Sequence, residues 1–321
     1  MSSFRYLRFG TETISIGKGQ IDGIGVRPRL CAEASDGSPL IEKSYAPGDI
    51  VDVSTAIAAA ANWLRETQDV DLVAASHRVV HGGPDYDRAA LVDDNVLQRL
   101  EQLVALAPLH QPNNLAPIRT LRKLRPGLVQ VACFDTAFHR THSAVADRYA
   151  IPEHFYREGV RRYGFHGLSY EYIAGRLHEI APSVAKGRVI VAHLGSGASM
   201  CALAAGNSIE STMGFTALDG LPMGTRSGQI DPGVLLYMLG EKGMSAKALE
   251  NLLYRESGLK AISDISNDMR ELEASDSCRQ TSDRVFCLSD RIECRHAGCR
   301  SRRARCIRFH CWHWRKFTDD P

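Results

Sequence analysis

Short apolar runs of strand length alternate with segments of helical character through the first 277 residues. Residues 72–80, 129–134 and 188–194 are apolar runs that end in a glycine-rich loop or at an aspartate, as buried strands do. Composition and apolar spacing predict helices at 54–66, 94–107, 169–181, 232–240 and 245–256. This alternation is typical of an α/β protein with mixed sheets.

Length and composition place the chain among ordinary globular proteins. It has 321 residues, of which 44% are hydrophobic and 24% charged, and about 100–200 residues per domain suggests two domains. No run reaches the roughly 18 apolar residues of a membrane-spanning helix. The first residues also lack the apolar stretch of a secretory signal. We therefore expect a cytoplasmic location and no membrane partner.

Residues 278–321 differ from the rest in cysteine content and charge. They hold six of the nine cysteines and a formal charge of +6, whereas the whole chain carries +2 and residues 1–277 therefore carry −4. Because the larger part is mildly acidic, the basic balance of the whole chain does not favour a nucleic-acid partner.

No helical or strand period is visible after about residue 277. The cysteines there form no C-x2-C pair, so their spacing disfavours a structural zinc module, and an unstructured basic tail fits better. A third interpretation is a frameshift. The codons of residues 309–317, read one nucleotide later, allow Phe-Thr-Ala-Gly-Ile-Gly-Glu-Asn, which is glycine-rich like a phosphate loop. We expect residues 278–321 to be a non-native, disordered tail produced by a frameshift near Ser277.

Four segments, three of them rich in glycine, place polar side chains where strands are expected to end. The crevice beyond the strand ends is where open α/β sheets bind ligands. The segments are residues 76–83, 134–139, 161–167 and 193–199.

Arg78 lies within an apolar run, which predicts a buried guanidinium that needs an anionic partner. A substrate carboxylate or phosphate matches its planar fork, and a structural salt bridge fits equally well. Asp135 follows a buried strand, where a carboxylate can hold a proton or a metal-bound water. Taken alone, a turn or helix-cap role is the commoner use of such an aspartate.

His166 stands between Phe165 and Gly167, where the backbone can approach a ligand closely. A lone histidine is nevertheless more often a core residue. The strand at 188–194 runs into Gly195-Ser196-Gly197, whose N–H groups could bind phosphate, although many tight turns look the same.

Two later segments add charged candidates. Arg226 is a single cation among the glycines and hydroxyls of residues 220–228, where it could stabilise a transition state. Asp268 and Arg270 follow a short segment that begins at Gly258. An ordinary turn is the alternative for both.

Taken together, the motifs are far more specific than any one of them. They closely resemble the acetokinase (carboxylate kinase) family over nearly all of residues 2–277. In chain order they are HRVVHGG, APLHQPNN, FDTAFH, RRYGFHGLSY, VAHLGSGAS, MGFTALDGLPMGTRSGQIDPG and SNDMR. The resemblance implies an α/β fold of two actin-like, ribonuclease-H-like domains around a cleft, both incomplete here, and a homodimer.

The resemblance also implies a reaction and the residues that perform it. The family transfers the γ-phosphoryl group of ATP to acetate, reversibly, giving acetyl phosphate and ADP, with Mg²⁺ or Mn²⁺. Carried over by motif, Arg78 would bind the acetate carboxylate and Asp135 would hold the acid/base position. His166 and Arg226 would stabilise the transferring phosphoryl group.

The same motifs assign the nucleotide contacts. His193, Leu194, Gly195, Ser196 and Gly197 would line the phosphate side of the ATP site, and Asp268, Met269 and Arg270 the nucleoside side. Arg5 stands where the family has an ATP-contacting lysine. The family's metal-binding Asn and Glu are not found in this sequence, so no metal ligand is assigned.

The sequence also departs from the family pattern. Residues 1–6 match only the end of its opening N-x-G-S-S-S-[LI]-K-[FY], and Leu168-Ser169-Tyr170 stands where T-S-H is more usual. The expected domains are an N-terminal actin-like domain at 1–137 that lacks its first strand, a truncated nucleotide-binding domain at 138–277, and the tail. Two alternatives to acetate phosphorylation stay open: an inactive remnant, and a kinase for propionate or butyrate.

Overall fold

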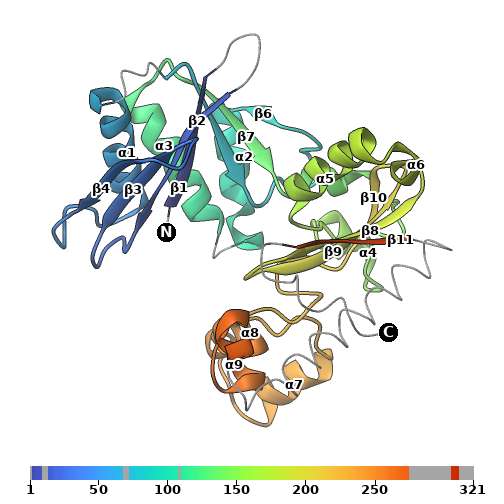
Figure 1. The fold of residues 1–321 in the computed structure, drawn as a ribbon. Coiled ribbons are helices and arrows are strands. Elements are labelled where there is room, and N and C mark those ends of the chain that lie inside the picture. The colour runs from blue at the N-terminus through green and yellow to red at the C-terminus, as the bar shows by residue number, and fades with distance from the viewer. Residues whose placement is uncertain (1, 9–13, 68–71, 108–109, 275–304, 311–321) are drawn as a thin grey trace. The chain divides into compact units, whose positions relative to one another are not determined.

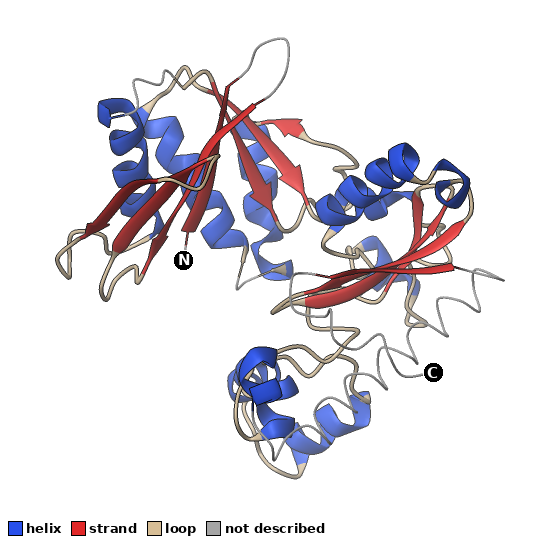
Figure 2. Ribbon diagram, viewed as in Figure 1, coloured by secondary structure: helices blue, strands red, loops and turns tan. Residues whose placement is uncertain are grey.

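The computed structural model describes residues 2–8, 14–67, 72–107 and 110–274, and the backbone of 305–310 (Figure 1; Figure 2). The chain divides into two compact units. Unit 1 comprises Met1–Val79, Ala90–Val104 and Pro108–Ala132. Unit 2 comprises Val80–Ala89, Ala105–Ala107 and the chain from Cys133 onward. The boundary expected at residue 137 lies just inside unit 2.

Unit 1 begins with a four-stranded antiparallel sheet in the order β1-β2-β3-β4. Glycines in the second strand make room for aromatic rings of the first, because a side-chain carbon at Gly17 would lie 2.6 Å from the Tyr6 hydroxyl. Helix α1 (Val53–Thr67) packs Trp63 against the same core. The strands are β1 (Ser2–Arg8), β2 (Ile14–Asp22), β3 (Arg29–Ala34) and β4 (Pro39–Ser44).

A second sheet has the order β5-β7-β6, with strands β5 (Ala74–Val79), β7 (Val129–Phe134) and β6 (Ala90–Leu91). Helices α2 (Asp94–Gln102) and α3 (Gln111–Leu124) follow the pattern of apolar residues. The helix expected at 94–107 ends earlier as an α-helix and continues as the 3₁₀ turn Leu103–Leu106. A proline at position 108 has no N–H to continue the α-helical bonding, which favours this tighter last turn.

Unit 2 is built on a sheet in the order β10-β9-β8-β11. Alternate residues of β8 face opposite clusters, because Val189 and Val191 pack with Tyr170 and Leu177 of α5, whereas Ile190 packs with Phe165. Both faces of the strand are therefore covered, as its unbroken apolar sequence predicts. The elements are α5 (Gly167–Ile180), α6 (Pro182–Ala185), β8 (Arg188–Leu194), β9 (Ala198–Ala204) and β10 (Asn207–Ser211).

Short helices make up the rest of unit 2. Asp231 caps α7 by accepting from the Gly233 N–H, as its Asp-Pro start predicts, and Ser245 caps α8 by accepting from the Ala248 N–H. In the described part of the chain, no helix has the length and apolar content that a membrane span requires. The helices are η2 (Ala137–Thr141), α4 (Glu153–Arg157), α7 (Pro232–Gly240), α8 (Ala246–Arg255), α9 (Gly258–Ser263) and α10 (Met269–Ala274).

The structure describes one strand within residues 278–321, where the sequence shows no strand period. Strand β11 (Arg305–His310) pairs in parallel with β8, from Arg305 beside Val189 to His310 beside Leu194 (Figure 1). The free edge of an apolar strand offers backbone N–H and C=O groups to any extended segment, and side-chain periodicity does not reveal such pairing. Otherwise the predicted disordered tail, that is residues 278–304 and 311–321, lies outside the described residues. The frameshift stays a prediction.

Candidate active site

The start of α5 is locked to the end of β7. His166, the N-cap residue, has a left-handed backbone with φ of 60°, and the Gly167 N–H donates to the Asp135 carbonyl over 2.8 Å. A side-chain carbon at Gly167 would lie 2.2 Å from that carbonyl oxygen. Gly167 was expected to let the backbone approach a ligand closely. In the structure it instead lets the backbone of Asp135 approach. Asp135, 2% exposed, is thus held beside His166.

The loop between β8 and β9 meets the same helix end. Within it the Gly195 N–H donates to the Gly197 carbonyl over 3.1 Å, which forms a tight turn after the buried Leu194. Gly195 and Ser196 are exposed. The imidazole of His193, the last-but-one residue of β8, stacks on that of His166 with ring centroids 4.1 Å apart. The resemblance expected these residues at one phosphate site, and the structure brings them together.

Two nitrogen-bearing side chains converge on Gly197. A side-chain carbon at this position would lie 3.4 Å from Nε2 of His166 and 3.8 Å from Nη1 of Arg226. Because Gly197 has no side chain, a small space is left open there. The imidazole of His166 and the guanidinium of Arg226 both border this space. The positive end of the α5 dipole is at the same place, because His166 caps that helix. An anion is the ligand that this arrangement would stabilise.

Arg226 is held by neutral groups. Its Nη1 donates to the Ala217 carbonyl over 2.9 Å and lies 3.6 Å from the Met223 sulfur. Among the described residues no carboxylate forms an ion pair with it. Burial lowers the pKa of Arg226 below its usual value, partly opposed by Tyr254. A bound anion would stabilise this half-buried cation.

Sequence reasoning did not single out the groups that hold the two imidazoles. Nδ1 of His166 lies 2.7 Å from the Ser199 hydroxyl, which lies 2.5 Å from the Tyr170 hydroxyl. Nδ1 of His193 lies 3.0 Å from the Ser169 hydroxyl. All three hydroxyl residues lie in or beside the quoted motifs RRYGFHGLSY and VAHLGSGAS. Their proximity to the histidines depends on the packing of α5 against the sheet.

Two buried histidines support the backbone around the site. Nε2 of His139 donates to the Phe165 carbonyl over 2.9 Å, next to His166 in the chain, and its Nδ1 lies 2.8 Å from the Ser208 hydroxyl. Burial lowers the pKa of His139 to about 3. His81 packs edge-on against Tyr163, and burial lowers its pKa to about 4. Both are therefore neutral structural histidines at neutral pH.

The two predicted arginines of unit 1 are both exposed. Arg78 lies on β5, and the expectation that its guanidinium is buried is wrong. The reason is that β5 is an edge strand of its sheet, in which only Val79 is buried. Arg5 lies on β1 opposite Lys18, which forms an ion pair with Glu33 at 2.7 Å.

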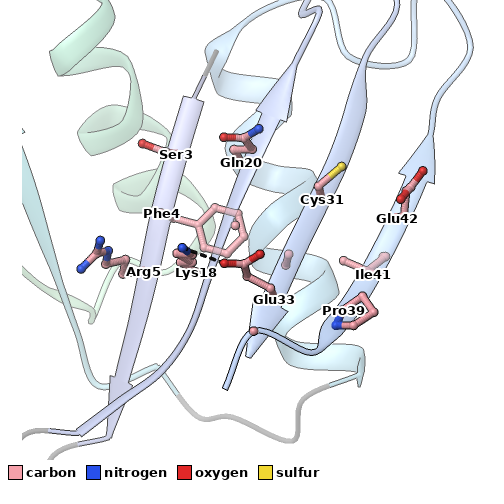
Figure 3. Close-up of a pocket in the computed structure, with 13 residues that line it drawn as sticks. Ser3, Phe4, Arg5, Lys18, Gln20, Cys31, Glu33, Pro39, Ile41 and Glu42 are labelled. Carbon is pink, nitrogen blue, oxygen red and sulfur yellow. Dashed lines mark ion pairs between the residues drawn. The ribbon is translucent and has the colours of Figure 1, made fainter. Parts of the chain in front are cut away.

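Arg5 also borders a pocket along the first sheet of unit 1 (Figure 3). The pocket has a volume of about 670 Å³ and includes Phe4, Cys31 and Glu42 along four neighbouring strands. Of the predicted site residues, Arg5 is the one that lines it.

Asp268 and Arg270, two of the residues predicted to border the nucleoside, form an ion pair with each other. Nε of Arg270 donates to an Asp268 carboxylate oxygen over 2.9 Å, and the same carboxylate accepts from the Arg270 backbone N–H. This pairing raises the pKa of Arg270 above its usual value. Met269 packs against the core that contains Phe165. The carbonyl of the preceding Asn267 would lie 3.1 Å from a side-chain carbon at Gly224.

A family profile matches almost the whole chain. The profile of the "Acetokinase family" covers residues 7–290. The chain belongs to the acetokinase family. The family expected from the sequence motifs is therefore confirmed, and the match includes every predicted site residue except Arg5.

Curated acetokinases from bacteria are closely similar. The acetate kinase of Nitrobacter hamburgensis is 66% identical over 259 residues, which is 81% of this chain and 64% of that protein. The acetate kinase of Rhizobium meliloti is 55% identical over 278 residues, which is 86% of this chain and 70% of that protein. The chain thus spans about two thirds of the length of these relatives.

Solved acetokinase structures confirm the fold. Porphyromonas gingivalis acetate kinase has a TM-score of 0.81 and 30% identity, over 94% of this chain and 78% of that one. A propionate kinase from Francisella tularensis has a TM-score of 0.83 and 32% identity, over 94% of this chain and 81% of that one. The expected α/β, actin-like fold class is therefore confirmed.

Proposed function

We propose that this chain transfers the γ-phosphoryl group of ATP to acetate and forms acetyl phosphate and ADP, reversibly. The observation that carries the proposal is the convergence of His166 Nε2 and Arg226 Nη1 on Gly197 at the positive end of α5. Relatives that are 66% and 55% identical and are named acetate kinase support acetate as the acceptor.

Phosphoryl transfer depends on positioning and on positive charge more than on covalent chemistry. A carboxylate oxygen of acetate attacks the γ-phosphorus while the bond to the β,γ-bridging oxygen breaks, and that oxygen leaves with ADP. Arg226 and His166 would stabilise the equatorial oxygens during transfer. Backbone N–H groups of Gly195, Ser196 and Gly197 would bind the nucleotide phosphates, next to His193 and Leu194.

The acceptor would be bound by Arg78. An exposed guanidinium can form two parallel hydrogen bonds with a small carboxylate. Propionate and butyrate carry the same carboxylate, and a propionate kinase is among the similar structures. Because one extra methylene is worth about 1–3 kcal/mol in a fitted pocket, acetate should be preferred over propionate by roughly 10-fold or more.

A divalent cation is part of the proposal, and the chemistry of Asp135 fits it. Magnesium is usually held by one or two carboxylates together with substrate phosphates. Asp135 is a buried acidic residue whose backbone carbonyl accepts from the N–H of Gly167, the neighbour of His166. Among the described residues no cluster of three or more His, Cys, Asp or Glu forms a metal site by itself. Bound Mg²⁺, or Mn²⁺, would neutralise charge on the phosphate oxygens. Asp135 could also orient the acetate.

The remaining nucleotide contacts are proposed from the family motifs. Asp268, Met269 and Arg270 would border the nucleoside, where Asp268 and Arg270 form an ion pair with each other. Arg5 would contact ATP with the charge that a lysine supplies elsewhere in the family.

We also propose that the chain forms a homodimer through α7. Helix α7 is apolar along its whole length, yet none of its residues is buried. Leu236 is 69% exposed and Tyr237 is 50% exposed. Large exposed apolar side chains grouped on one helix are typical of protein interfaces. Cys31 and Cys201 are free thiols, which supports a reducing, cytoplasmic location. Neither a nucleic acid nor a membrane is proposed as a partner.

The proposed activity is tested by trapping acetyl phosphate as its hydroxamate. Purified full-length chain, checked for folding by circular dichroism, is given ATP, Mg²⁺ and either acetate, propionate or butyrate. ATP-dependent hydroxamate with the highest kcat/KM for acetate is expected. A preference for propionate or butyrate would favour the alternative carboxylate kinases. No hydroxamate from the folded chain would favour the inactive remnant and overturn the proposal.

A further inference from the structure

The hydroxyls of Tyr170 and Ser199 form a chain of hydrogen bonds that ends at the imidazole of His166. Tyr170 lies on α5 and Ser199 on β9, and both are fully buried, with 0% exposure. The Tyr170 and Ser199 oxygens are 2.5 Å apart, and the Ser199 oxygen is 2.7 Å from Nδ1 of His166. Three groups from two elements are therefore connected by two hydrogen bonds.

The direction of these hydrogen bonds follows from counting protons. Ser199 has one hydroxyl proton but two neighbours, so it donates to one and accepts from the other. Within the described residues the Tyr170 hydroxyl has one side-chain partner, Ser199, and its other contact is the His193 backbone N–H, which only donates. A buried hydroxyl that donates to nothing costs about 1–3 kcal/mol. Tyr170 therefore donates to Ser199.

The direction of the second hydrogen bond, between Ser199 and His166, is then determined as well. Because Ser199 accepts from Tyr170, its own proton goes to Nδ1 of His166. Burial raises the pKa of Tyr170 well above 10, so the phenol keeps its proton throughout the working pH range. A neutral imidazole that accepts at Nδ1 carries its single proton on Nε2. Nε2 is the nitrogen that faces Gly197 together with Arg226.

We propose that Tyr170 and Ser199 are positioning residues that hold the proton of His166 on Nε2, where it can be donated in a hydrogen bond to a phosphoryl oxygen. The inference rests on the proposed phosphoryl transfer for its purpose, although the tautomer itself does not depend on activity. Tyr170 is also a position at which this chain departs from the T-S-H of the family pattern.

The direct test is the tautomer of His166 in the full chain. The chain contains 12 histidines, so ¹⁵N-histidine is incorporated and the His166 signals are assigned as those lost in His166→Gln. Spectra are recorded near pH 8, above the usual histidine pKa of about 6.5. The expected result is a protonated Nε2 and an unprotonated Nδ1. A protonated Nδ1 would overturn the proposal without any test variant having to fold.

Substitutions then test the role of the two hydrogen bonds that connect Tyr170, Ser199 and His166, called the relay below. Tyr170→Phe and Ser199→Ala each remove one hydroxyl, and Tyr172→Phe is the matched control, because Tyr172 is 66% exposed on the same helix. We expect both relay variants to shift His166 toward a mixture of tautomers and to lower kcat by about 10- to 100-fold, as lost orienting partners do elsewhere. The KM for ATP should change by less than about 3-fold, and Tyr172→Phe should match the parent chain.

The outcomes separate this inference from the proposed function. Relay variants that keep the parent tautomer and kcat would overturn the inference, even in an active enzyme. A chain without kinase activity that nevertheless shows the Nε2 tautomer, lost in Ser199→Ala, would overturn the proposed function and leave the relay supported.

Discussion

The imidazoles of His166 and His193 stack nearly face to face, with centroids 4.1 Å apart and ring planes inclined by 24°. One ring belongs to the N-cap residue of α5 and the other to a residue near the end of β8. The stack therefore ties the helix end to the strand end at which the phosphate would bind. Each ring is further held at Nδ1, by Ser199 and Ser169 respectively.

Removal of the stack should weaken catalysis more than removal of the hydrogen bond alone. In His193→Ala the ring is lost, whereas His193→Phe keeps an aromatic surface and loses the contact with Ser169. An aromatic pair contributes about 0.5–1.5 kcal/mol, so His193→Ala should lower kcat further than His193→Phe by about 2- to 10-fold. Steady-state kinetics by the hydroxamate assay measures the difference. Equal kcat values for the two variants would mean that the stack has no role.

Gly197 provides a test of the anion space itself. Gly197→Ala would place a methyl group 3.4 Å from His166 Nε2, an ordinary contact distance, so the fold should tolerate it. The methyl would occupy the space that faces Arg226, and we expect kcat/KM for ATP to fall at least about 10-fold. Gly175→Ala is the matched control, because a carbon there meets nothing within 4 Å.

Urea unfolding and kinetics are measured together on the Gly197 and Gly175 variants. Gly197→Ala should unfold at the same urea concentration as the parent chain, while Gly175→Ala, inside α5, should be stabilised by about 0.5–1 kcal/mol. Unchanged kinetics in folded Gly197→Ala would argue against phosphate binding at this position.

Some of this organisation was predictable from sequence because it is local. Strand β8 and helix α7 coincide with their predicted ranges, since each is defined by an apolar run and a clear stop or cap. Strand β9 was not predicted, because six of its seven residues are buried and no alternation marks it. The pairing of β11 with β8 likewise depends on an open strand edge.

The limits of prediction in the site have the same physical origin. Gly-rich loops and isolated charges pointed to His166, Gly197 and Arg226 within their own segments. The hydroxyl partners were not predicted, because Tyr170 and Ser199 are 29 residues apart and meet through packing alone. The burial of Arg78 was mispredicted because an apolar run does not distinguish a central strand from an edge strand.

The buried histidines predict how stability depends on pH. The pKa values of His81 and His139 are lowered by burial to about 4 and about 3, from 6.5. Above about pH 6.5 both are neutral in the folded and unfolded chain. Below pH 6.5 the two histidines bind protons in the unfolded chain but stay neutral in the folded chain. The free energy of unfolding should therefore fall as the pH decreases. The slope is at most about 1.4 kcal/mol per pH unit for each histidine.

Urea unfolding at pH 7.5, 6.5, 5.5 and 5.0 measures this dependence. The series stops at pH 5.0 because carboxyl groups, whose usual pKa values are about 4, become protonated below it and would also change the stability. The midpoint should hold between pH 7.5 and 6.5 and then decrease. A midpoint that is constant down to pH 5.0 would show that these histidines are not buried in the neutral form.

The proposed dimer is tested by a charge placed on α7. Leu236→Glu puts a carboxylate in the apolar surface and should convert a dimer to a monomer in sedimentation velocity experiments at micromolar concentration. Leu124→Glu is the control, since Leu124 is 49% exposed on α3 of unit 1. A monomeric parent chain, or a Leu236→Glu variant that stays dimeric, would exclude α7 as the interface.

The central claim, that Arg226 and His166 stabilise a transferring phosphoryl group at Gly197, is tested most directly by Arg226→Ala. Arg176→Ala, an exposed arginine on α5, is the control. With ATP, Mg²⁺ and acetate, we expect the parent chain and Arg176→Ala to form acetyl phosphate at equal rates, and Arg226→Ala to do so with kcat about 10³-fold lower. A folded Arg226→Ala variant that keeps the parent kcat would contradict the account.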